Sequence, residues 1–319
     1  MKSSRRANSW SQLTAVATLL LAPLVNADDV VLACPQGEQD STAIITNGLR
    51  DTRDRGTLYL GPCTYYLASA VEARWNHVGI IQGKGKDLTF IKILPGAKID
   101  GVPISAWEGR SWSTLFLFEN PDFGAITISD LSIVVTDPEP AGVQDDDDWW
   151  KGSLYNMIVV TGPDVDTRIE RASFRGATGE FFGYNVAHIA HIFNAQVFQV
   201  PKRMNGDLTV IDCDFGSTVV TLNPGGILGG AITIINNTFE DSSYGPMIED
   251  CSDCTVRIIG NSIRDVRDIG IGLLGTGKLM LEPSTYSVEE NSFYAPNLPP
   301  DKRVVADGID GSLVKISNN

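Results

Sequence analysis

The sequence predicts an all-β solenoid, in which short strands stack in successive turns of the chain. The phrase ITIINNTF at 232–239 returns as VRIIGNSI at 256–263, a step of 24 residues. Within each phrase, alternate positions are apolar, and this period of two is the pattern of a β-strand. A fixed period with no helix between the copies is typical of repeat architectures. We therefore expect each turn to stack about 4.8 Å from the previous one.

Further copies of the phrase extend the repeat over most of the chain. They begin at positions 126, 167, 208, 286 and 314, with a weaker version, VGIIQGKG, at 78–85. Successive starts differ by 48, 41, 41, 24, 24, 30 and 28 residues. We interpret the 48 as two periods, each 41 as one turn with a long insertion, and the 30 and 28 as turns with small insertions.

An asparagine recurs at the sixth position of four copies, as Asn237, Asn261, Asn291 and Asn319. Asparagine tolerates the left-handed backbone that a sharp corner needs, and stacked amides form hydrogen bonds along a stack. The alternative is that asparagine is simply common in turns. The in-register recurrence favours a ladder of stacked asparagines at one corner of the solenoid.

The first 27 residues resemble a secretory signal. A basic start with Lys2, Arg5 and Arg6 precedes an apolar stretch and a small-x-small site that ends at Ala27. This predicts a secreted, periplasmic or extracellular protein, with one domain at 28–319 and no membrane span. Without the segment, the net charge of −14 becomes −17. Such a charge argues against a nucleic-acid partner, and it would repel a polyanion unless cations bridge the two surfaces.

Five cysteines in an exported chain predict disulfides. Cys34 and Cys63 flank the N-terminal segment and are expected to form one. Cys251 and Cys254 lie in a CxxC motif that fits either a local disulfide or two packed thiols. Cys213 is left over, and we expect it to be a small buried residue.

A short helix is expected at 40–51, where Ala43, Ile44, Ile45 and Leu49 have helical spacing. It precedes GTLYLGPCTYYLAS at 56–69, which has the pattern of an opening strand. Together with VGIIQGKG and the ITIINNTF phrases, this segment resembles the right-handed parallel β-helix proteins of the pectate-lyase-like superfamily. The resemblance covers about residues 38–319.

The resemblance implies coils of three strands, a helical cap at the N-terminal end, and an asparagine corner between the second and third strands. A groove for substrate is expected along the sheet of first strands, which are identified at 156–160, 218–222, 246–250 and 269–273. The superfamily contains lyases, hydrolases, epimerases and non-catalytic proteins, so the fold leaves the activity open.

Two insertions, at 137–152 and 174–191, are expected to wall this groove. Aromatic and amide side chains would bind sugar rings there; the candidates are Trp149, Trp150, Tyr155, Asn156 and Tyr184. The carboxylates of Asp145, Asp146, Asp147 and Asp148 would supply oxygen ligands for calcium. The alternative is a solvated acidic loop with one tryptophan packed on the wall, since four consecutive aspartates lack the spacing of a calcium loop.

The catalytic candidates are His188, His191, Lys202, Arg203 and Glu249. A histidine serves as a general acid or base near neutral pH, and lyases of this fold use a lysine or arginine as the base. Glu249 alternates with Ile248 and is expected to face the groove. The alternatives are wall histidines bonded to backbone and solvated charges. The catalytic motifs of polygalacturonases, alginate epimerases and pectate lyases are absent from the sequence.

The sequence thus predicts a secreted protein that acts on an extracellular polysaccharide by β-elimination or hydrolysis, with calcium as a possible cofactor. The alternative is a non-catalytic carbohydrate-binding, adhesin-like or structural surface solenoid. The final copy, VKISNN, lacks the apolar residue that follows the corner in the other copies. We therefore expect a truncated or uncapped end that is open to self-association.

Overall fold

The structure is a computed structural model. It describes residues 29–97, 99, 101–103, 111–135, 155–176, 187–193, 206–218, 220–227, 229–275 and 282–319. The predicted signal segment lies outside these residues. Within them, none of the helices combines the length and the apolar character needed to cross a membrane.

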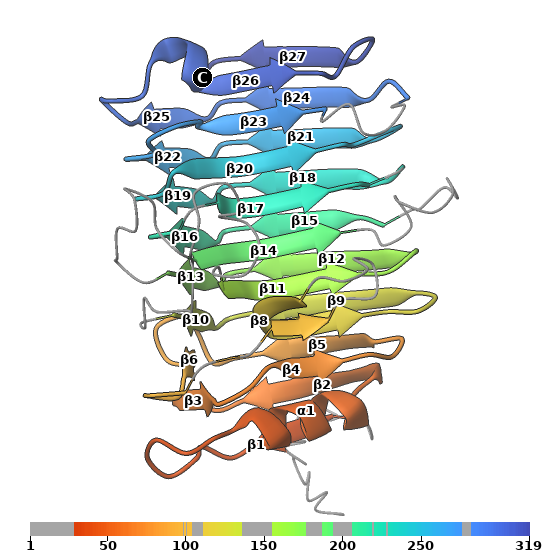
Figure 1. Ribbon diagram of the computed structural model, residues 1–319, viewed down its shortest axis with the longest axis vertical. Helices are drawn as coiled ribbons and strands as arrows, with labels where there is room; N and C mark the ends of the chain where they lie inside the picture. The colour runs from red at the N-terminus through yellow and green to blue at the C-terminus, as the bar shows by residue number, and fades with distance from the viewer. Residues whose placement is uncertain are drawn as a thin grey trace, which may run out of the picture.

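The chain winds into a column with three long walls of parallel strands (Figure 1). The ten-stranded wall, sheet A, contains β1 (Val30–Leu32), β2 (Asp54–Leu60), β5 (Val78–Gln82), β9 (Gly124–Ser129), β12 (Val165–Glu170), β15 (Leu208–Ile211), β18 (Ala231–Ile235), β21 (Thr255–Ile259), β24 (Thr285–Glu289) and β27 (Leu313–Ser317).

The eight-stranded wall, sheet B, contains β3 (Thr64–Leu67), β6 (Phe90–Ile93), β10 (Ser132–Val134), β13 (Ser173–Arg175), β16 (Asp214–Gly216), β19 (Thr238–Glu240), β22 (Ser262–Arg264) and β25 (Ser292–Tyr294). The third wall, sheet C, contains β4 (Val71–Ala73), β8 (Ser111–Glu119), β11 (Tyr155–Thr161), β14 (Ala187–Phe193), β17 (Val220–Gly225), β20 (Tyr244–Glu249), β23 (Ile271–Leu274) and β26 (Val304–Asp307). A short strand, β7 (Gly101–Pro103), pairs antiparallel with β8, and a 3-10 helix, η2, spans Pro300–Lys302.

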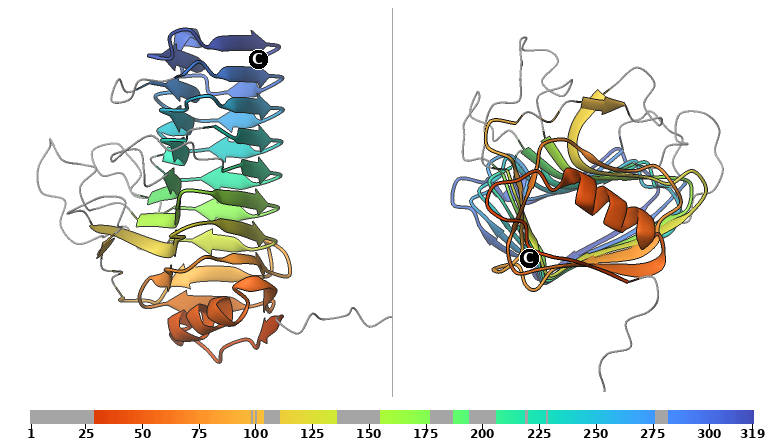
Figure 2. Two further views of the ribbon diagram at one scale, coloured as in Figure 1. Left: turned by 90° about the vertical axis from the view of Figure 1, so that its right-hand side faces the viewer. Right: turned by 90° about the horizontal axis from the view of Figure 1, so that it is seen from below.

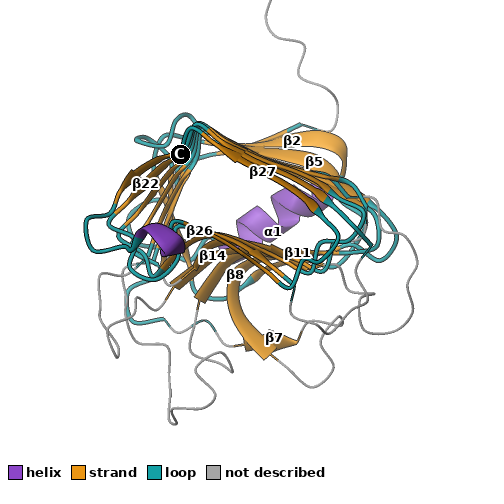
Figure 3. Cartoon of the chain, turned by 90° about the horizontal axis from the view of Figure 1, so that it is seen from above, coloured by secondary structure: helices purple, strands orange, loops and turns teal. Residues whose placement is uncertain are grey.

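The coil is right-handed. Seen from its C-terminal end, the chain passes counterclockwise from sheet A (β27) to sheet B (β22) to sheet C (β26) while it rises toward the viewer (Figure 3). The predicted fold class, a right-handed parallel β-helix of three-strand coils, is therefore confirmed. The predicted first strands overlap with β11, β17, β20 and β23, all in sheet C, with boundaries that differ by a few residues.

One interval of the repeat was interpreted wrongly. Strand β5 pairs directly with β9, so the 48-residue step is one coil with an insertion and not two periods. The pairing also joins Gly79, not Val78, to Ile126, which shifts the weak first copy by one residue. The 41-residue steps are single coils, as predicted, because β9, β12 and β15 are consecutive neighbours.

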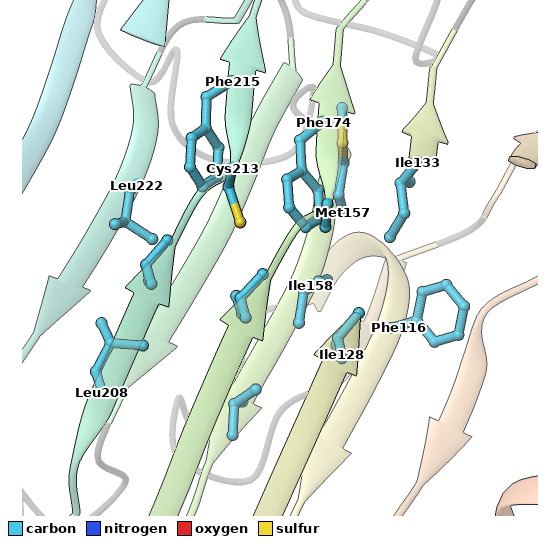
Figure 4. Packing of buried hydrophobic residues seen from close by; sticks show 14 of the residues in the cluster. Phe116, Ile128, Ile133, Met157, Ile158, Phe174, Leu208, Cys213, Phe215 and Leu222 are labelled. Atoms are coloured by element: carbon cyan, nitrogen blue, oxygen red, sulfur yellow. The ribbon is translucent and has the colours of Figure 1, made fainter. Parts of the chain in front are cut away.

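The interior of the β-helix is filled by stacks of apolar side chains, and each coil contributes one side chain to each stack. Phe174, Phe215 and Phe239 stack with ring centroids 5.2 and 5.0 Å apart, close to the spacing of neighbouring strands. Figure 4 labels two of them, Phe174 and Phe215, in the same buried cluster as Ile158 and Leu222 of sheet C. Burial of these side chains is the main stabilising contribution to the stack.

The corner between sheets A and B is built from two adjacent residues with different tasks. The left-handed residue is the fifth of the phrase: its φ is 56° at Asn236, 66° at Gly260 and 58° at Glu290. The sixth residue, the recurrent asparagine, is instead buried. The prediction of a ladder is confirmed, but the left-handed backbone was assigned to the wrong residue.

The buried asparagines satisfy backbone groups as well as one another. The Oδ1 atom of Asn261 accepts hydrogen bonds from the backbone N–H and the Nδ2 of Asn237, at 2.8 and 3.0 Å. Its own Nδ2 donates to the backbone oxygen of Ile234 and to Oδ1 of Asn291. Asn291 bonds to Asn319 in the same way. The ladder begins at Cys213, whose backbone N–H donates to Oδ1 of Asn237.

Helix α1 (Thr42–Asp51) lies across the N-terminal end of the column (Figure 2). Ile45 and Leu49 are buried against the first coil as predicted, but Ala43 and Ile44 are exposed, so the buried face of the helix is turned relative to the prediction. The predicted Cys34–Cys63 disulfide is present. Cys251 and Cys254 form a second disulfide, and Cys213 is a buried free thiol.

The last strand, β27, forms the opposite end of the described column. Leu313 and Ile316 on this strand are 68% and 50% exposed. Ile316 pairs with Val288, which is fully buried, so Ile316 belongs to an interior column that becomes accessible at this end. Self-association through this surface stays a prediction.

Candidate functional site

Both predicted insertions lead into sheet C. The first separates β10 from β11, and the second separates β13 from β14. Most of the side chains proposed there lie outside the described residues, namely Asp145, Asp146, Asp147, Asp148, Trp149, Trp150, Tyr184, Lys202 and Arg203. The structure therefore tests neither the sugar-binding tryptophans nor the calcium site. Among the described residues, no group of three or more His, Cys, Asp or Glu side chains could hold a metal ion.

Strand register shows which of the other candidates are neighbours. Tyr155 pairs with Ala187, and Asn156 pairs with both Thr114 and His188. His191 pairs with Val159 on one side and with Asn223 on the other. The two histidines are therefore three positions apart along β14, with different neighbours. Only His191 lies beside a polar residue of the next coil, β17.

The outer face of sheet C is defined by the strand alternation. Leu222, Ile248 and Leu273 are buried in the interior core. Their sequence neighbours Asn223, Glu249 and Leu274 therefore point to the outside of the wall. Glu249 pairs with Leu274, which pairs with Asp307, so two carboxylates flank a leucine in one column.

A small apolar cluster lies on the same outer face, separate from the interior core. Met247 is its buried centre, and Tyr244, Ile269 and Leu274 pack against it. Gly272 of the next coil makes room for the methionine, since a Cβ atom there would lie 2.5 Å from the Met247 sulfur. The cluster forms an apolar surface between the polar groups of β17 and those of β26.

Two polar atoms near this surface are buried and have no hydrogen-bond partner. They are the Thr221 hydroxyl and the Oδ1 atom of Asn223, both on β17. An unpaired buried polar group costs about 1–3 kcal/mol. Such groups are expected where a bound water or ligand completes the hydrogen bonding.

We refer to Asn223, Tyr244, Met247, Glu249, Leu274 and Asp307 as the outer patch. It runs over four consecutive strands of sheet C, from β17 to β26, and His191 lies next to its first residue in the register. Of the predicted catalytic residues, Glu249 is in the patch and His191 borders it, whereas His188 pairs with Asn156 instead. Sequence reasoning missed Asn223 and Asp307. The predicted first strand ended at 222, one residue before Asn223.

Asp268 and His77 have pKa values that burial displaces from their ordinary range. Burial raises the pKa of Asp268, against the opposing effect of Arg267, and the Asp268 carboxylate has one buried oxygen without a hydrogen-bond partner. Burial lowers the pKa of His77 to about 4, with a smaller opposing effect of Asp54. Both ring nitrogens of His77 are unpaired, and its ring lies 5.7 Å from that of Phe118. His77 is thus a neutral core residue, far in sequence from the outer patch.

Comparisons with known proteins add little to this geometry. The chain matches no protein-family model, and no curated protein is similar to it. One solved structure, the catalytic domain of Agl-KA, is similar over 91% of this chain and 68% of its own, with 10% identity and a TM-score of 0.27. A similarity at that level carries no argument about activity, and the functional proposal below rests on the residues themselves.

Proposed function

We propose that the protein is exported and acts on an extracellular polysaccharide, which binds along the outer face of sheet C at the outer patch. The proposal rests on one observation, the combination of an apolar cluster with polar groups on either side of it. The C–H faces of sugar rings pack on apolar and aromatic side chains, while their hydroxyls need hydrogen-bond partners. Tyr244 and Leu274, which are partly exposed around the buried Met247, provide the first kind of surface, and Asn223, Glu249 and Asp307 provide the second.

Hydrolysis is the activity that this geometry supports best. Glu249 and Asp307 lie two strand spacings apart, so their Cα atoms are separated by about 9.5 Å. Inverting glycosidases hold the two carboxyl groups about 6.5–9.5 Å apart to leave room for the attacking water, and side chains that project from Cα atoms at this spacing can reach that range. In this proposal one carboxyl group protonates the leaving oxygen, and the other removes a proton from water. By its register with Asn223 on the neighbouring strand, His191 stays a candidate for a further acid or base.

Binding without cleavage is the second candidate. Leu274 stands between Glu249 and Asp307 in the same column, where the reacting bond and the water would have to lie. A leucine at that position favours a surface that retains a polymer without cutting it. Under this alternative the protein is a carbohydrate-binding or adhesin-like solenoid.

A polysaccharide panel distinguishes the activities. The full chain would be incubated with polyuronates, neutral glucans and xylans, and amino-sugar polymers, each with calcium and with a chelator. Hydrolysis produces reducing ends alone, β-elimination produces an unsaturated sugar that absorbs ultraviolet light, and pure binding produces neither. If calcium bound by Asp145–Asp148 takes part, the chelator should weaken binding or cleavage.

Variants then locate the site. For hydrolysis, Glu249→Gln and Asp307→Asn should each lower kcat by about 10²-fold or more. Asp301→Asn is the matched control, because Asp301 is an exposed carboxylate in η2 and not in sheet C. Replacing Trp149 and Trp150 by alanine should weaken binding by about 1 kcal/mol for each ring, with Tm unchanged. No binding to any polymer, or equal effects of the control and patch variants, would refute the proposal.

A further inference from the structure

The corner of the coil formed by β18 and β19 carries a feature that the other described corners lack. Asn236, the left-handed residue of this corner, is exposed, and it begins the tripeptide Asn236-Asn237-Thr238. Asn-x-Ser/Thr with x other than proline is the acceptor motif for N-linked glycans in exported proteins. The equivalent positions in five other coils are Asp130, Arg171, Asp212, Gly260 and Glu290, none of which is an acceptor.

The surroundings of Asn236 leave its side-chain amide accessible. In the next coil the equivalent position is Gly260, and a Cβ atom there would lie 2.9 Å from Oδ1 of Asn236. Because glycine has no Cβ, residue 260 places no side chain against the amide. Within the described ranges no hydrogen bond involves the Asn236 side chain, whereas Asn237 next to it is 1% exposed and committed to the ladder. The two asparagines of the motif therefore have separate roles.

We propose that Asn236 is an N-glycosylation site. The amide nitrogen of Asn236 forms a bond to the anomeric carbon of an oligosaccharide carried on a lipid diphosphate. The bond from that carbon to the diphosphate oxygen breaks, and the amide proton leaves with the lipid diphosphate. No oxidant or reductant is needed. The proposal requires export through a glycosylating route, but it does not depend on polysaccharide binding at the outer patch.

The position of the corner separates the glycan from the proposed binding surface. Asn236 lies where sheet A passes into sheet B, and sheet C is the wall opposite that corner (Figure 3). A glycan on Asn236 would extend from this corner and leave the outer patch uncovered. It would also leave the buried ladder intact, because the side chain it modifies takes no part in it.

The test is expression of the full chain, with its own N-terminal segment, in a eukaryotic secretory host. The secreted protein should carry one N-glycan, seen as a single mobility shift that peptide N-glycosidase removes, with Asn236 converted to aspartate in the peptide mass map. Asn236→Gln and Thr238→Val should each abolish the shift, whereas Thr238→Ser should keep it. Polymer binding by Asn236→Gln should be unchanged.

The repeat also offers a matched gain of site. Glu290→Asn places Asn-Asn-Ser at the equivalent corner two coils further on, where φ is already 58°. This variant should carry two glycans in place of one. A secreted protein with an unmodified Asn236 peptide would overturn the proposal. Occupancy of the Glu290→Asn site in the same host would strengthen that result, because it would show that the host glycosylates this protein. Retention of an unglycosylated chain inside the cell would also count against it.

Discussion

The lower coils, which start with β9 and β12, and the upper coils, which start with β18, β21 and β24, stabilise the same corner in different ways. In the upper coils the sixth residue of the phrase is a buried asparagine that bonds to the coils on both sides. In the lower coils it is Leu131 or Ala172, both fully buried and apolar. There the polar contacts lie on the outside: Arg171 donates two hydrogen bonds to Asp130, at 2.8 and 2.9 Å.

The difference separates the conformation of a corner from the interactions that stabilise it. Asp130, Arg171 and Asn236 all have a left-handed φ, between 50° and 56°, although their neighbours in the interior differ. A buried amide ladder excludes water and depends on every member, whereas an exposed ion pair is screened by salt. We therefore expect the two halves to respond differently to mutation, pH and ionic strength.

The largest effect is expected from Asn261→Leu, in the middle of the ladder. It removes the acceptor for the backbone N–H and the Nδ2 of Asn237 and exposes no alternative. With about 1–3 kcal/mol for each orphaned group, the free energy of unfolding should fall by about 3–5 kcal/mol. Urea unfolding measures this. Asn297→Leu, at an exposed position, is the control, and equal losses for both variants would contradict a structural ladder.

The loss of stability on removing each disulfide should increase with the length of the loop that the disulfide closes. Cys34 and Cys63 are 29 residues apart, whereas Cys251 and Cys254 are 3 apart. Loop-closure entropy predicts losses of about 3–4 and about 1–2 kcal/mol when each pair is replaced by serine. Comparison of the urea midpoints of the two double variants measures the difference. A larger loss for the Cys251–Cys254 pair would show that native packing, and not the unfolded chain, dominates.

Acid should destabilise the lower half through His77. Its pKa is about 4 in the folded protein, against an ordinary value of 6.5, so the folded state favours the neutral ring. The contribution of the neutral His77 ring to the free energy of unfolding is therefore fully present above pH 6.5. It falls as the pH drops toward 4, by up to roughly 3 kcal/mol. Thermal unfolding from pH 7 to pH 4 measures the slope. His77→Leu should flatten it, and an unchanged slope in that variant would assign the effect to carboxylates elsewhere.

The smallest effect is expected for the exposed ion pair of the lower corner. Arg171 is half-exposed, so Arg171→Gln should cost only about 0.5–1 kcal/mol at low salt. The loss should vanish near about 1 M salt, where the Debye length is about 3 Å. The cost of Asn261→Leu should stay nearly constant over the same range. A salt-independent loss for Arg171→Gln would mean that its packing, rather than its charge, stabilises the corner.

The sequence alone determined the features that a short repeat encodes. The period and the strand alternation predicted stacked coils, the in-register asparagines predicted a ladder, and the position of two cysteines around the cap predicted their disulfide. These features depend on neighbouring residues or on the fixed step of 24, so they are readable along the chain. The helical segment was also readable, but which of its residues are buried was not, because Ile44 and Ile45 both fit an apolar face.

Tertiary structure decided what depends on pairing between coils of unequal length. Glu249, Leu274 and Asp307 form one column although 25 and 33 residues separate them, because backbone hydrogen bonds between strands set the register and the loops absorb the difference. The same pairing placed His191 beside Asn223 and made the 48-residue step a single coil. It also put the left-handed backbone at Asn236 and buried Asn237. Only stacked neighbours distinguish those two adjacent asparagines, since one fills the interior and the other turns to solvent.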